Sequence, residues 1–270
     1  MKYKISDEQR YFYQGNGYVV IEDFLDADEL AIWREVTEDA VKQRLMERNG
    51  LTNQDDQEAY YSQVFIQAVR LADTHAGMAQ LMFDERLGEA AGTLAGVDGI
   101  RIWHDQALFK QPYGNPTGWH LDNPYWSFSS RDAISIWVAL DRATLANGCL
   151  WYMPGTHRIA RYDNSGIGAN IGSLFKVYPE WAAMKAVPAP CPAGSAVFHN
   201  GLIAHGAGAN MTPAPRRAMT CAYMPDGCTF NGQKNVLRDD YFRSLTIGDV
   251  IDDPKQVPLI WHKKTRHKSR

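Results

Sequence analysis

The first third of the chain shows apolar residues at helical spacing. Ser6, with Gln9 three residues later, matches a capping box and predicts a helix that ends near Gly17. Residues 17–25 then form a run rich in β-forming side chains. The following segment has one apolar face that predicts a longer helix. This face consists of Leu30, Trp33, Val36, Thr37, Ala40, Val41 and Leu45. With two more short helices predicted within residues 64–95, the N-terminal part should pack helices against the outer face of a sheet.

From residue 99 onward the pattern changes to short strands. Apolar runs over residues 100–110, 134–140 and 195–198 predict strands. Turn-forming pairs such as Asn147-Gly148 and Pro154-Gly155 separate these runs. Many short strands joined by such turns favour a sandwich or a jelly roll. The predicted organisation is one domain over residues 1–270, divided into a helical part (1–98), a jelly-roll core (99–224) and a C-terminal extension (225–270).

Three segments lack a regular pattern. Residues 49–60 are polar and are expected to form an exposed loop. Residues 158–184 contain several glycines and either cover the mouth of the barrel or form a surface insertion, and the pattern does not choose between these interpretations. The chain after Tyr223 is polar and ends in a basic run, which predicts a solvated or frayed terminus.

Composition and charge narrow the class of protein. The chain has 270 residues, of which 45% are hydrophobic and 22% charged, as expected of a globular protein. A net charge of −3 provides no electrostatic footprint for nucleic acid, and no apolar run reaches the length of a membrane span. The N-terminus lacks the apolar core of a signal peptide, and the four cysteines show no Cys-x-x-Cys spacing. These features predict a cytoplasmic protein without nucleic-acid or membrane partners, and they leave the oligomeric state open.

The strongest chemical signal is the pair His120 and Asp122. On a strand, residues two apart share a face, with Cα atoms roughly 6.6 Å apart, so this imidazole and carboxylate are expected to bind one divalent metal. A third ligand has to come from a distant strand, and His199 and His205 are candidates that the residues alone do not separate. Two His and one carboxylate on one face of an ion leave the other face open, as in the facial triad of non-haem Fe(II) oxygenases.

An arginine that follows His205 is a candidate ligand for a carboxylate. Arg216 lies eleven residues after His205, at the start of a predicted strand. Its rigid fork matches a carboxylate, and on a strand paired beside the one that carries His205 it would lie just beyond the metal. The cosubstrate that this arrangement suits is 2-oxoglutarate, which chelates iron at one end and carries a second carboxylate at the other. Arg217 is the next residue and faces the opposite side of the strand, and spacing alone does not choose between the two.

Further motifs occur in an order that resembles a known family. They are Asn16-Gly17-Tyr18-Val19-Val20-Ile21, Lys110-Gln111-Pro112, Ser135-Ile136-Trp137, Asn147-Gly148-Cys149-Leu150 and Met153-Pro154-Gly155-Thr156-His157. With these motifs the sequence resembles the phytanoyl-CoA dioxygenase family of Fe(II)/2-oxoglutarate oxygenases over roughly residues 5–225. The resemblance implies a mainly β fold, a double-stranded β-helix of the jelly-roll or cupin-like type, packed by N-terminal helices.

The resemblance also implies roles for individual residues. The implied ligands are His120, Asp122 and His205 for iron, and Arg216, Lys110 and Trp137 for 2-oxoglutarate. It thus favours Arg216 over Arg217. Ala207 is a departure, because many members carry a hydroxyl residue at this position, two after the distal histidine, where it helps to hold the cosubstrate.

The implied reaction is the oxidation, typically the hydroxylation, of a small molecule by O₂ with release of succinate and CO₂. Asp122 argues against halogenation, because halogenating relatives lack this carboxylate. Tyr125, Trp126 and Gln106 are candidate substrate contacts. No basic cluster precedes the tail to bind the phosphates of a CoA ester, which favours a small metabolite or a natural-product intermediate as substrate.

Two other functions remain as alternatives. One is a metal-dependent isomerase or hydrolase on a cupin-like barrel that does not use 2-oxoglutarate. Arg216 argues against it, because such an enzyme needs no buried cation there. The other is a non-catalytic jelly-roll binding module, and the complete set of three metal ligands and an arginine argues against that.

Overall fold

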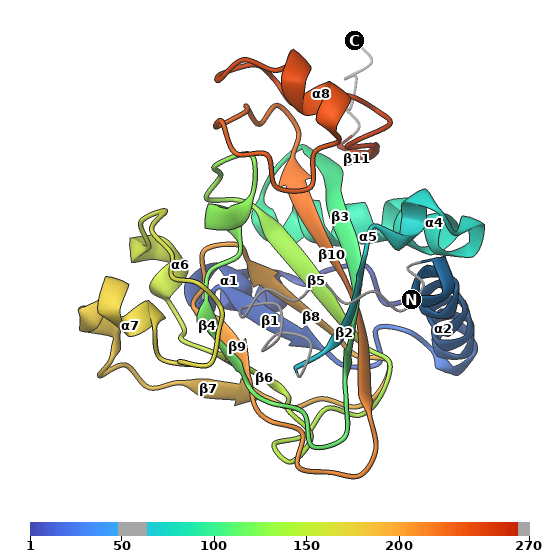
Figure 1. Cartoon of the computed structure of the whole chain (residues 1–270), viewed down its shortest axis with the longest axis vertical. Helices are drawn as coiled ribbons and strands as arrows, with labels where there is room; N and C mark the ends of the chain where they lie inside the picture. The colour runs from blue at the N-terminus through green and yellow to red at the C-terminus, as the bar shows by residue number, and fades with distance from the viewer. Residues whose placement is uncertain (48–63, 264–270) are drawn as a thin grey trace.

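The computed structural model describes residues 1–47 and 64–263. Two features considered above, the exposed loop expected at residues 49–60 and the basic end of the chain from residue 264, lie outside the described residues. Within them, helices cover one face of a large sheet, and a smaller sheet lies on its other side (Figure 1).

Two antiparallel sheets form the barrel. The larger sheet has seven strands in the order β1-β8-β5-β10-β3-β11, with β2 paired to β3. Its strands are β1 (Tyr18–Ile21), β2 (Ile66–Val69), β3 (Gly99–Lys110), β5 (Ile134–Ala139), β8 (Ala196–Asn200), β10 (Arg216–Pro225) and β11 (Leu259–His262). The smaller sheet has the order β4-β9-β6-β7, with β4 (Thr117–His120), β6 (Leu150–Tyr152), β7 (Val187–Ala189) and β9 (His205–Ala207). The predicted fold, a jelly roll with flanking helices, is confirmed.

The helices fall into two sets by length. The long ones near the N-terminus are α1 (Asp7–Asn16), α2 (Ala27–Glu47), α4 (Ala76–Met82) and α5 (Glu85–Ala95). Shorter ones are α6 (Thr156–Ile159), α7 (Leu174–Val177), α8 (Asp239–Ser244) and the 3₁₀ turns η1 (Leu71–Asp73), η2 (Asn123–Tyr125) and η3 (Pro179–Trp181). The predicted capping box of α1 is confirmed, since Ser6 and Gln9 exchange hydrogen bonds of 3.1 and 2.9 Å. Among the described helices, none has both the length and the apolar character needed to cross a bilayer.

The central strands of the larger sheet are buried on both faces. All six residues of β5 are buried. Because side chains alternate along a strand, Ile134, Ile136 and Val138 point to the helical layer. Trp137 and Ala139 point between the sheets instead. The helical layer contributes Trp33, Val41, Met78, Leu87 and Leu94 to the same core as the isoleucines. The N-terminal helices thus support the sheet from behind and leave its inner face for the site.

Strand β2 was not predicted. Residues 64–95 contain the two expected helices, α4 and α5, but also this strand, which pairs with β3 from Ile66 opposite Phe109 to Val69 opposite Gln106. The first 98 residues are therefore not only helical, because they add β1 and β2 to the larger sheet.

The expectation of a frayed terminus is wrong for residues 226–263. This segment forms α8 and β11 at one end of the molecule, beyond the ends of β3 and β10 (Figure 1). Strand β11 pairs with β3, and Trp261 packs closely against α5 at Gly88 and Gly92. The segment also buries a set of scattered apolar side chains against Trp103. They are Phe230, Leu237, Ile251 and Val257. Burial of these side chains explains why a polar sequence folds back onto the barrel.

Candidate metal and cosubstrate site

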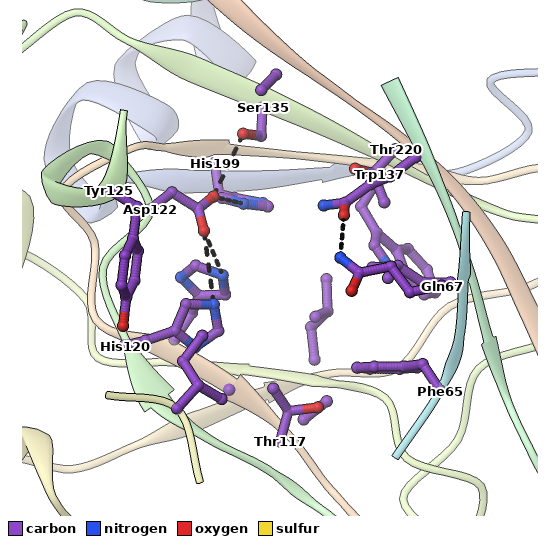
Figure 2. Close-up of a pocket in the computed structure, with 18 of the residues that line it drawn as sticks. Phe65, Gln67, Thr117, His120, Asp122, Tyr125, Ser135, Trp137, His199 and Thr220 are labelled. Atoms are coloured by element: carbon purple, nitrogen blue, oxygen red, sulfur yellow. Dashed lines mark hydrogen bonds and ion pairs between the residues drawn. The ribbon is translucent and has the colours of Figure 1, made fainter. Parts of the chain in front are cut away.

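Three metal-binding side chains meet where the two sheets face each other. Strands β4 and β9 pair so that His120 and His205 are Cα partners. The Nε2 atoms of His120 and His205 lie 3.5 and 3.7 Å from Oδ1 of Asp122. The three possible ligand atoms lie within 4.8 Å of one another, on one wall of a cavity (Figure 2). Two imidazole nitrogens and one carboxylate oxygen at this spacing fit a single divalent iron with an open face toward the cavity.

The strand geometry predicted for His120 and Asp122 is wrong in one respect. Strand β4 ends at His120, and Asp122 begins the 3₁₀ turn η2 with φ −81° and ψ −53°. The backbone N–H groups of Asp122 and Asn123 donate to the carbonyl of Gly201, at 3.0 and 2.8 Å. A turn anchored to a neighbouring loop, and not strand alternation, thus brings the carboxylate to the histidines.

Backbone carbonyls fix the tautomers of the two ligand histidines. Nδ1 of His120 lies 2.8 Å from the carbonyl oxygen of Gly118, and Nδ1 of His205 lies 3.1 Å from that of Ile203. A carbonyl oxygen can only accept a hydrogen bond, so each Nδ1 carries the proton. Each Nε2 then has its lone pair free and faces Asp122, as a metal ligand requires.

His199 lies behind the metal ligands. From β8, its Nε2 lies 3.3 Å from Oδ2 of Asp122, and Ser135 donates to the same oxygen at 3.4 Å. An ionised carboxylate only accepts, so Nε2 of His199 carries the proton, and its Nδ1 accepts from the hydroxyl of Tyr152 at 3.1 Å. Oδ2 is therefore held from behind while Oδ1 faces His205, which favours His205 over His199 as the third ligand.

Burial and neighbouring charges set the protonation of this cluster. Burial acts to raise the pKa of Asp122, but His205, His120 and His199 together hold that pKa well below its usual range. Burial, and then the nearby His120, lower the pKa of His205 to about 3. The cluster therefore offers an ionised carboxylate and a neutral imidazole at neutral pH, which is the state that metal binding needs.

Arg216 is buried inside the barrel with unpaired donors. It lies on β10 in the larger sheet, so it comes from the sheet opposite His205 and not from a strand paired beside it as expected. Its Nη2 donates to the carbonyl of Gly148 at 3.2 Å, whereas Nε and Nη1 have no hydrogen-bond partner within the described structure. The guanidinium carbon lies 5.0 Å from the ring centre of Trp137 and 5.9 Å from that of Phe65. A buried cation with free donors is suited to an anionic ligand.

Arg217 faces the other side of the strand. Its Nε and Nη2 donate to Asp141 at 2.8 and 2.6 Å, and its Nη1 pairs with Glu38 of α2. The predicted alternation of the two arginines is present, and Arg217 serves the contact between the sheet and the helical layer.

Lys110 does not reach the cavity. Its Nζ donates to the carbonyl oxygens of Asn115 and Gly208, both at 2.8 Å. It is the Cα partner of Arg216, and it is not among the residues that line the cavity. Burial, and then the charge of Arg216, lower the pKa of Lys110 to about 7. The structure gives Lys110 a role in clamping two loops behind the cavity wall.

Apart from Arg216, the polar side chains that the larger sheet turns toward the cavity carry no formal charge. Gln67 on β2 donates its Nε2 to Oε1 of Gln106 on β3 at 2.6 Å (Figure 2). This bond uses one donor and one acceptor, so the pair keeps a carbonyl and an amide group for a ligand. His104 also lines the cavity, and burial lowers its pKa to about 4, which keeps it neutral. Asn235 reaches the same wall from the C-terminal extension.

The segment at residues 158–184 lies against the metal side of the cavity. Its Ile167 lines the cavity together with Tyr125 and Trp126. The hydroxyl of Tyr125 donates a hydrogen bond to the carbonyl oxygen of Ser165 at 2.5 Å. The backbone N–H of Trp119 donates to the carbonyl oxygen of Ile171 at 2.9 Å. The segment is therefore attached to the chain on both sides of the His120 motif.

Several lining residues were missed in the sequence. Phe65 and Gln67 come from β2, which was not predicted, and Asn235 comes from a segment expected to be frayed. Ser135 could have been found, because it lies two residues before Trp137 on β5 and side chains two apart on a strand face the same side. For Asn235 the sequence contains no local signal.

A jelly roll that encloses a His-Asp-His cluster, together with a buried guanidinium of which two donors have no partner in the described structure, has the architecture of the non-haem iron oxygenases. The model of the phytanoyl-CoA dioxygenase family matches residues 13–218, and the chain belongs to that family. It is an oxidoreductase, an iron- and 2-oxoglutarate-dependent dioxygenase that uses O₂. The isomerase or hydrolase and the non-catalytic binding module are thereby set aside.

Named relatives cover most of the chain. A methylphosphonate hydroxylase from Gimesia maris is 27% identical over 231 residues, which cover 83% of this chain and 82% of that protein. A probable alpha-ketoglutarate-dependent hypophosphite dioxygenase from Stutzerimonas stutzeri is 25% identical over 265 residues, or 93% of this chain and 90% of that protein. The solved structure of a non-heme alpha ketoglutarate dependent carbocyclase from nogalamycin biosynthesis matches with a TM-score of 0.77 at 25% identity, covering 95% of this chain and 96% of that one.

Proposed function

We propose that this dioxygenase binds Fe(II) through His120, Asp122 and His205, binds 2-oxoglutarate through Arg216, and oxidises a small uncharged molecule. The observation that carries the proposal is one cavity lined by all four side chains. The first three offer ligand atoms within 4.8 Å of one another, and Arg216 offers two donors that no described group uses. One cavity thus provides for a metal and for an anion.

The chain's own residues prepare the metal site. When bound, iron and 2-oxoglutarate supply the oxidising power, with O₂ as oxidant and succinate and CO₂ as co-products. The Gly118 and Ile203 carbonyls hold the protons of the two ligand histidines on Nδ1. Ser135 and His199 hold the outer oxygen of Asp122. The ligand atoms are therefore oriented before the metal arrives, which lowers the cost of ordering them.

Arg216 fits the far carboxylate of 2-oxoglutarate. Two of its donors are buried and unpaired, and Trp137 and Phe65 lie beside its guanidinium. Because the surroundings are apolar, a carboxylate bound here is desolvated and its hydrogen bonds to the cation are stronger than in water. Lys110 supports this end of the cavity from behind by holding Asn115 and Gly208 in place.

The charges on the cavity wall favour an uncharged substrate. Among the described residues that line the cavity, the side chains with a formal charge are Asp122 and Arg216, and both have assigned partners. The remaining polar wall consists of neutral amides, hydroxyls and His104. A phosphorus oxyanion or a CoA ester would find no second cation on this wall. The Gln67–Gln106 pair instead suits a ligand that both donates and accepts hydrogen bonds.

Succinate release measures this preference. We expect uncharged hydroxylated or amide-bearing ring compounds to stimulate succinate formation by the aerobic enzyme, while methylphosphonate and hypophosphite leave it at the basal rate. Gln106→Leu should weaken the response to any stimulating compound and leave the basal rate unchanged. Strong stimulation by methylphosphonate would contradict the proposed substrate class without affecting the assignment of the iron ligands.

We also propose a reducing, cytoplasmic setting. Cys149, Cys191 and Cys221 are buried free thiols, and Cys228 is a partly buried one. Free thiols of this kind persist where disulfides do not form readily.

A further inference from the structure

Two tyrosines connect the metal ligands to the surface of the molecule. Tyr152 on β6 is the Cα partner of His205, and the centre of its ring lies 6.0 Å from that of the imidazole. Tyr18 on β1 is the Cα partner of His199. The rings of Tyr18 and Tyr152 stack across the two sheets, with centres 4.3 Å apart and planes 11° from parallel. The strand registers therefore place two oxidisable rings in contact, one of them beside a metal ligand.

The phenol of Tyr152 has a base within hydrogen-bond distance. Its side chain is fully buried, and its hydroxyl donates to Nδ1 of His199 at 3.1 Å. Nε2 of His199 in turn donates to Asp122 at 3.3 Å. A phenol that loses an electron becomes a strong acid, so its oxidation is easiest where a neighbouring group takes the proton. His199 can take it on Nδ1, and the ionised Asp122 stabilises the imidazolium that forms.

Two aromatic side chains that line the cavity itself are poorer electron donors. The hydroxyl of Tyr125 donates to the carbonyl oxygen of Ser165, which is too weak a base to take up the proton. The ring of Trp137 faces the guanidinium of Arg216, whose central carbon lies 5.0 Å from the ring centre. This positive charge opposes the removal of an electron from the indole. The surroundings thus favour oxidation of Tyr152 over oxidation of these two residues.

Tyr18 gives the pair of tyrosines an outlet to solvent. It is 6% exposed and lines a surface groove between α1 and β7, beside Phe12 and Pro188. Its ring meets the exposed ring of Phe12 edge-on, with centres 5.7 Å apart. A small reductant in solution can approach Tyr18 through this groove, whereas the buried Tyr152 is reached through Tyr18.

We propose that Tyr152 and Tyr18 form a relay that discharges the oxidising equivalents of turnover without substrate. In that turnover 2-oxoglutarate and O₂ give succinate and CO₂, and two electrons and two protons must convert the remaining oxygen atom to water. In each of two rounds, Tyr152 passes an electron to the metal site and its proton to His199. Tyr18 then returns an electron to Tyr152, which recovers its proton from His199.

An external reductant completes each round. Tyr18 releases its proton to solvent when it is oxidised, and a small one-electron reductant such as ascorbate restores it, with a proton taken back from solvent. The two protons of the water come from solvent. Without the relay, the two electrons come from side chains beside the metal, which damages the site. The proposal rests on the proposed function, because it needs iron at His120, Asp122 and His205.

Radical detection in the absence of substrate tests the relay. Fe(II)-loaded protein with 2-oxoglutarate and no ascorbate is mixed with O₂, frozen rapidly and examined by electron paramagnetic resonance. Succinate is measured in the same samples, and the radical yield is expressed per succinate formed. We expect a tyrosyl radical in the natural protein, recognised by a signal that narrows when the tyrosines carry ring deuterium.

Three substitutions locate the radical. Tyr152→Phe should lose the signal and should show more oxidised residues beside the cavity in peptide mass spectrometry. Tyr18→Phe should keep the signal, now confined to Tyr152, and added ascorbate should no longer remove it quickly. Tyr223 is the matched control, because it is also fully buried but belongs to the core on the helical side of the sheet. Tyr223→Phe should therefore leave the radical yield unchanged.

Several results would overturn the relay. A tyrosyl signal that survives Tyr152→Phe would do so, and so would equal loss of the signal in Tyr223→Phe. Succinate formed without substrate and without a tyrosyl signal would show that the oxidising equivalents leave by another route. A protein that binds Fe(II) and 2-oxoglutarate but makes no succinate without substrate would leave the relay nothing to discharge, which also refutes it. If the natural protein does not bind Fe(II) and 2-oxoglutarate together, the proposed function fails, which is a separate result.

Discussion

Arg216 and Arg217 are neighbours in the sequence, yet their side chains lie on opposite faces of the sheet and have different partners. The side chain of Arg216 is 1% exposed and turned inward, whereas Arg217 binds Asp141 and Glu38 on the helical side. Both carry the same charge, and they differ in whether that charge has a protein partner. Among the described residues Arg216 has no acidic partner, and a buried cation in this state is suited to an anionic ligand.

This difference predicts opposite results from matched substitutions. Arg216→Ala should weaken 2-oxoglutarate binding by about 2–5 kcal/mol, because the partner carboxylate would be buried without its cation. Arg217→Ala should change 2-oxoglutarate affinity by less than about threefold and cost some stability through the lost ion pairs. Calorimetric titration of the anaerobic Fe(II) form measures both. Equal losses in the two variants would contradict the placement of the arginines on opposite faces.

Substitutions should also distinguish the roles of two histidines in this cluster, His205 and His199. His205→Ala removes a lone pair that faces the metal position, and we expect tight Fe(II) binding to be lost. His199→Ala removes only a support of Asp122, so Fe(II) should still bind at one per chain, about tenfold to hundredfold more weakly. Metal titration of the purified variants measures this. Retained tight binding in His205→Ala, with loss in His199→Ala, would exchange the two roles.

At the residue scale the sequence predicted which side chains meet at the cavity better than it predicted how they are held there. His120, Asp122, His205 and Arg216 follow from residue type, spacing and the family resemblance. The η2 turn that places Asp122 and the use of Lys110 as a clamp depend on backbone carbonyls of distant loops. Such partners leave no pattern in the sequence, because any residue provides a carbonyl.

Among the elements, the strongly patterned ones were predictable and the short edge strands were not. Strand β5 is a continuous run of six buried residues and helix α2 is 21 residues long, so each gives a signal within its own residues. Strands β2 and β11 have four residues each, and both pair with β3. Two helices separate β2 from β3 in the sequence, and most of the barrel separates β3 from β11. A strand of that length is specified by its neighbour in the sheet more than by its own composition.

Of the two interpretations left open for the 158–184 segment, we predict that it is a lid over the cavity. It is anchored through Tyr125 to Ser165 and places Ile167 on the cavity wall. Shortening it between Asn164 and Ser173 should leave Fe(II) and 2-oxoglutarate binding near normal, because none of their proposed ligands lies there. It should raise succinate formation without product, since water then reaches the site. The ratio of succinate to oxidised product measures this coupling, and a shortened variant that keeps the natural ratio would show that the segment is a surface insertion.

For the whole molecule, the C-terminal extension closes one end of the barrel. It buries Ile251 completely and brings Asn235 to the cavity wall. Ile251→Ala should lower the free energy of unfolding by about 2–5 kcal/mol, as expected for a cavity left in a packed cluster. Ile247, which is 72% exposed in the same extension, provides the matched control, and Ile247→Ala should change stability by less than about 0.5 kcal/mol. Equal effects in urea unfolding would mean that the extension does not pack as described.

The fold class could be predicted for the molecule as a whole because strand density, turns and family motifs all pointed to a jelly roll. The contribution of the extension could not, since its apolar residues are spread through a polar segment and become a core only against Trp103 of β3. Long-range burial of this kind is a property of the folded chain and not of any local window.

The central claim is that one cavity binds iron and 2-oxoglutarate together, and a single spectroscopic titration tests it most directly. Purified protein without metal is kept anaerobic and receives Fe(II) and then 2-oxoglutarate, while the visible spectrum is recorded. We predict a metal-to-ligand charge-transfer band that requires both additions, disappears in His205→Ala, and needs a much higher 2-oxoglutarate concentration in Arg216→Ala. Absence of the band in the natural protein, or a band unchanged in both variants, would contradict the account.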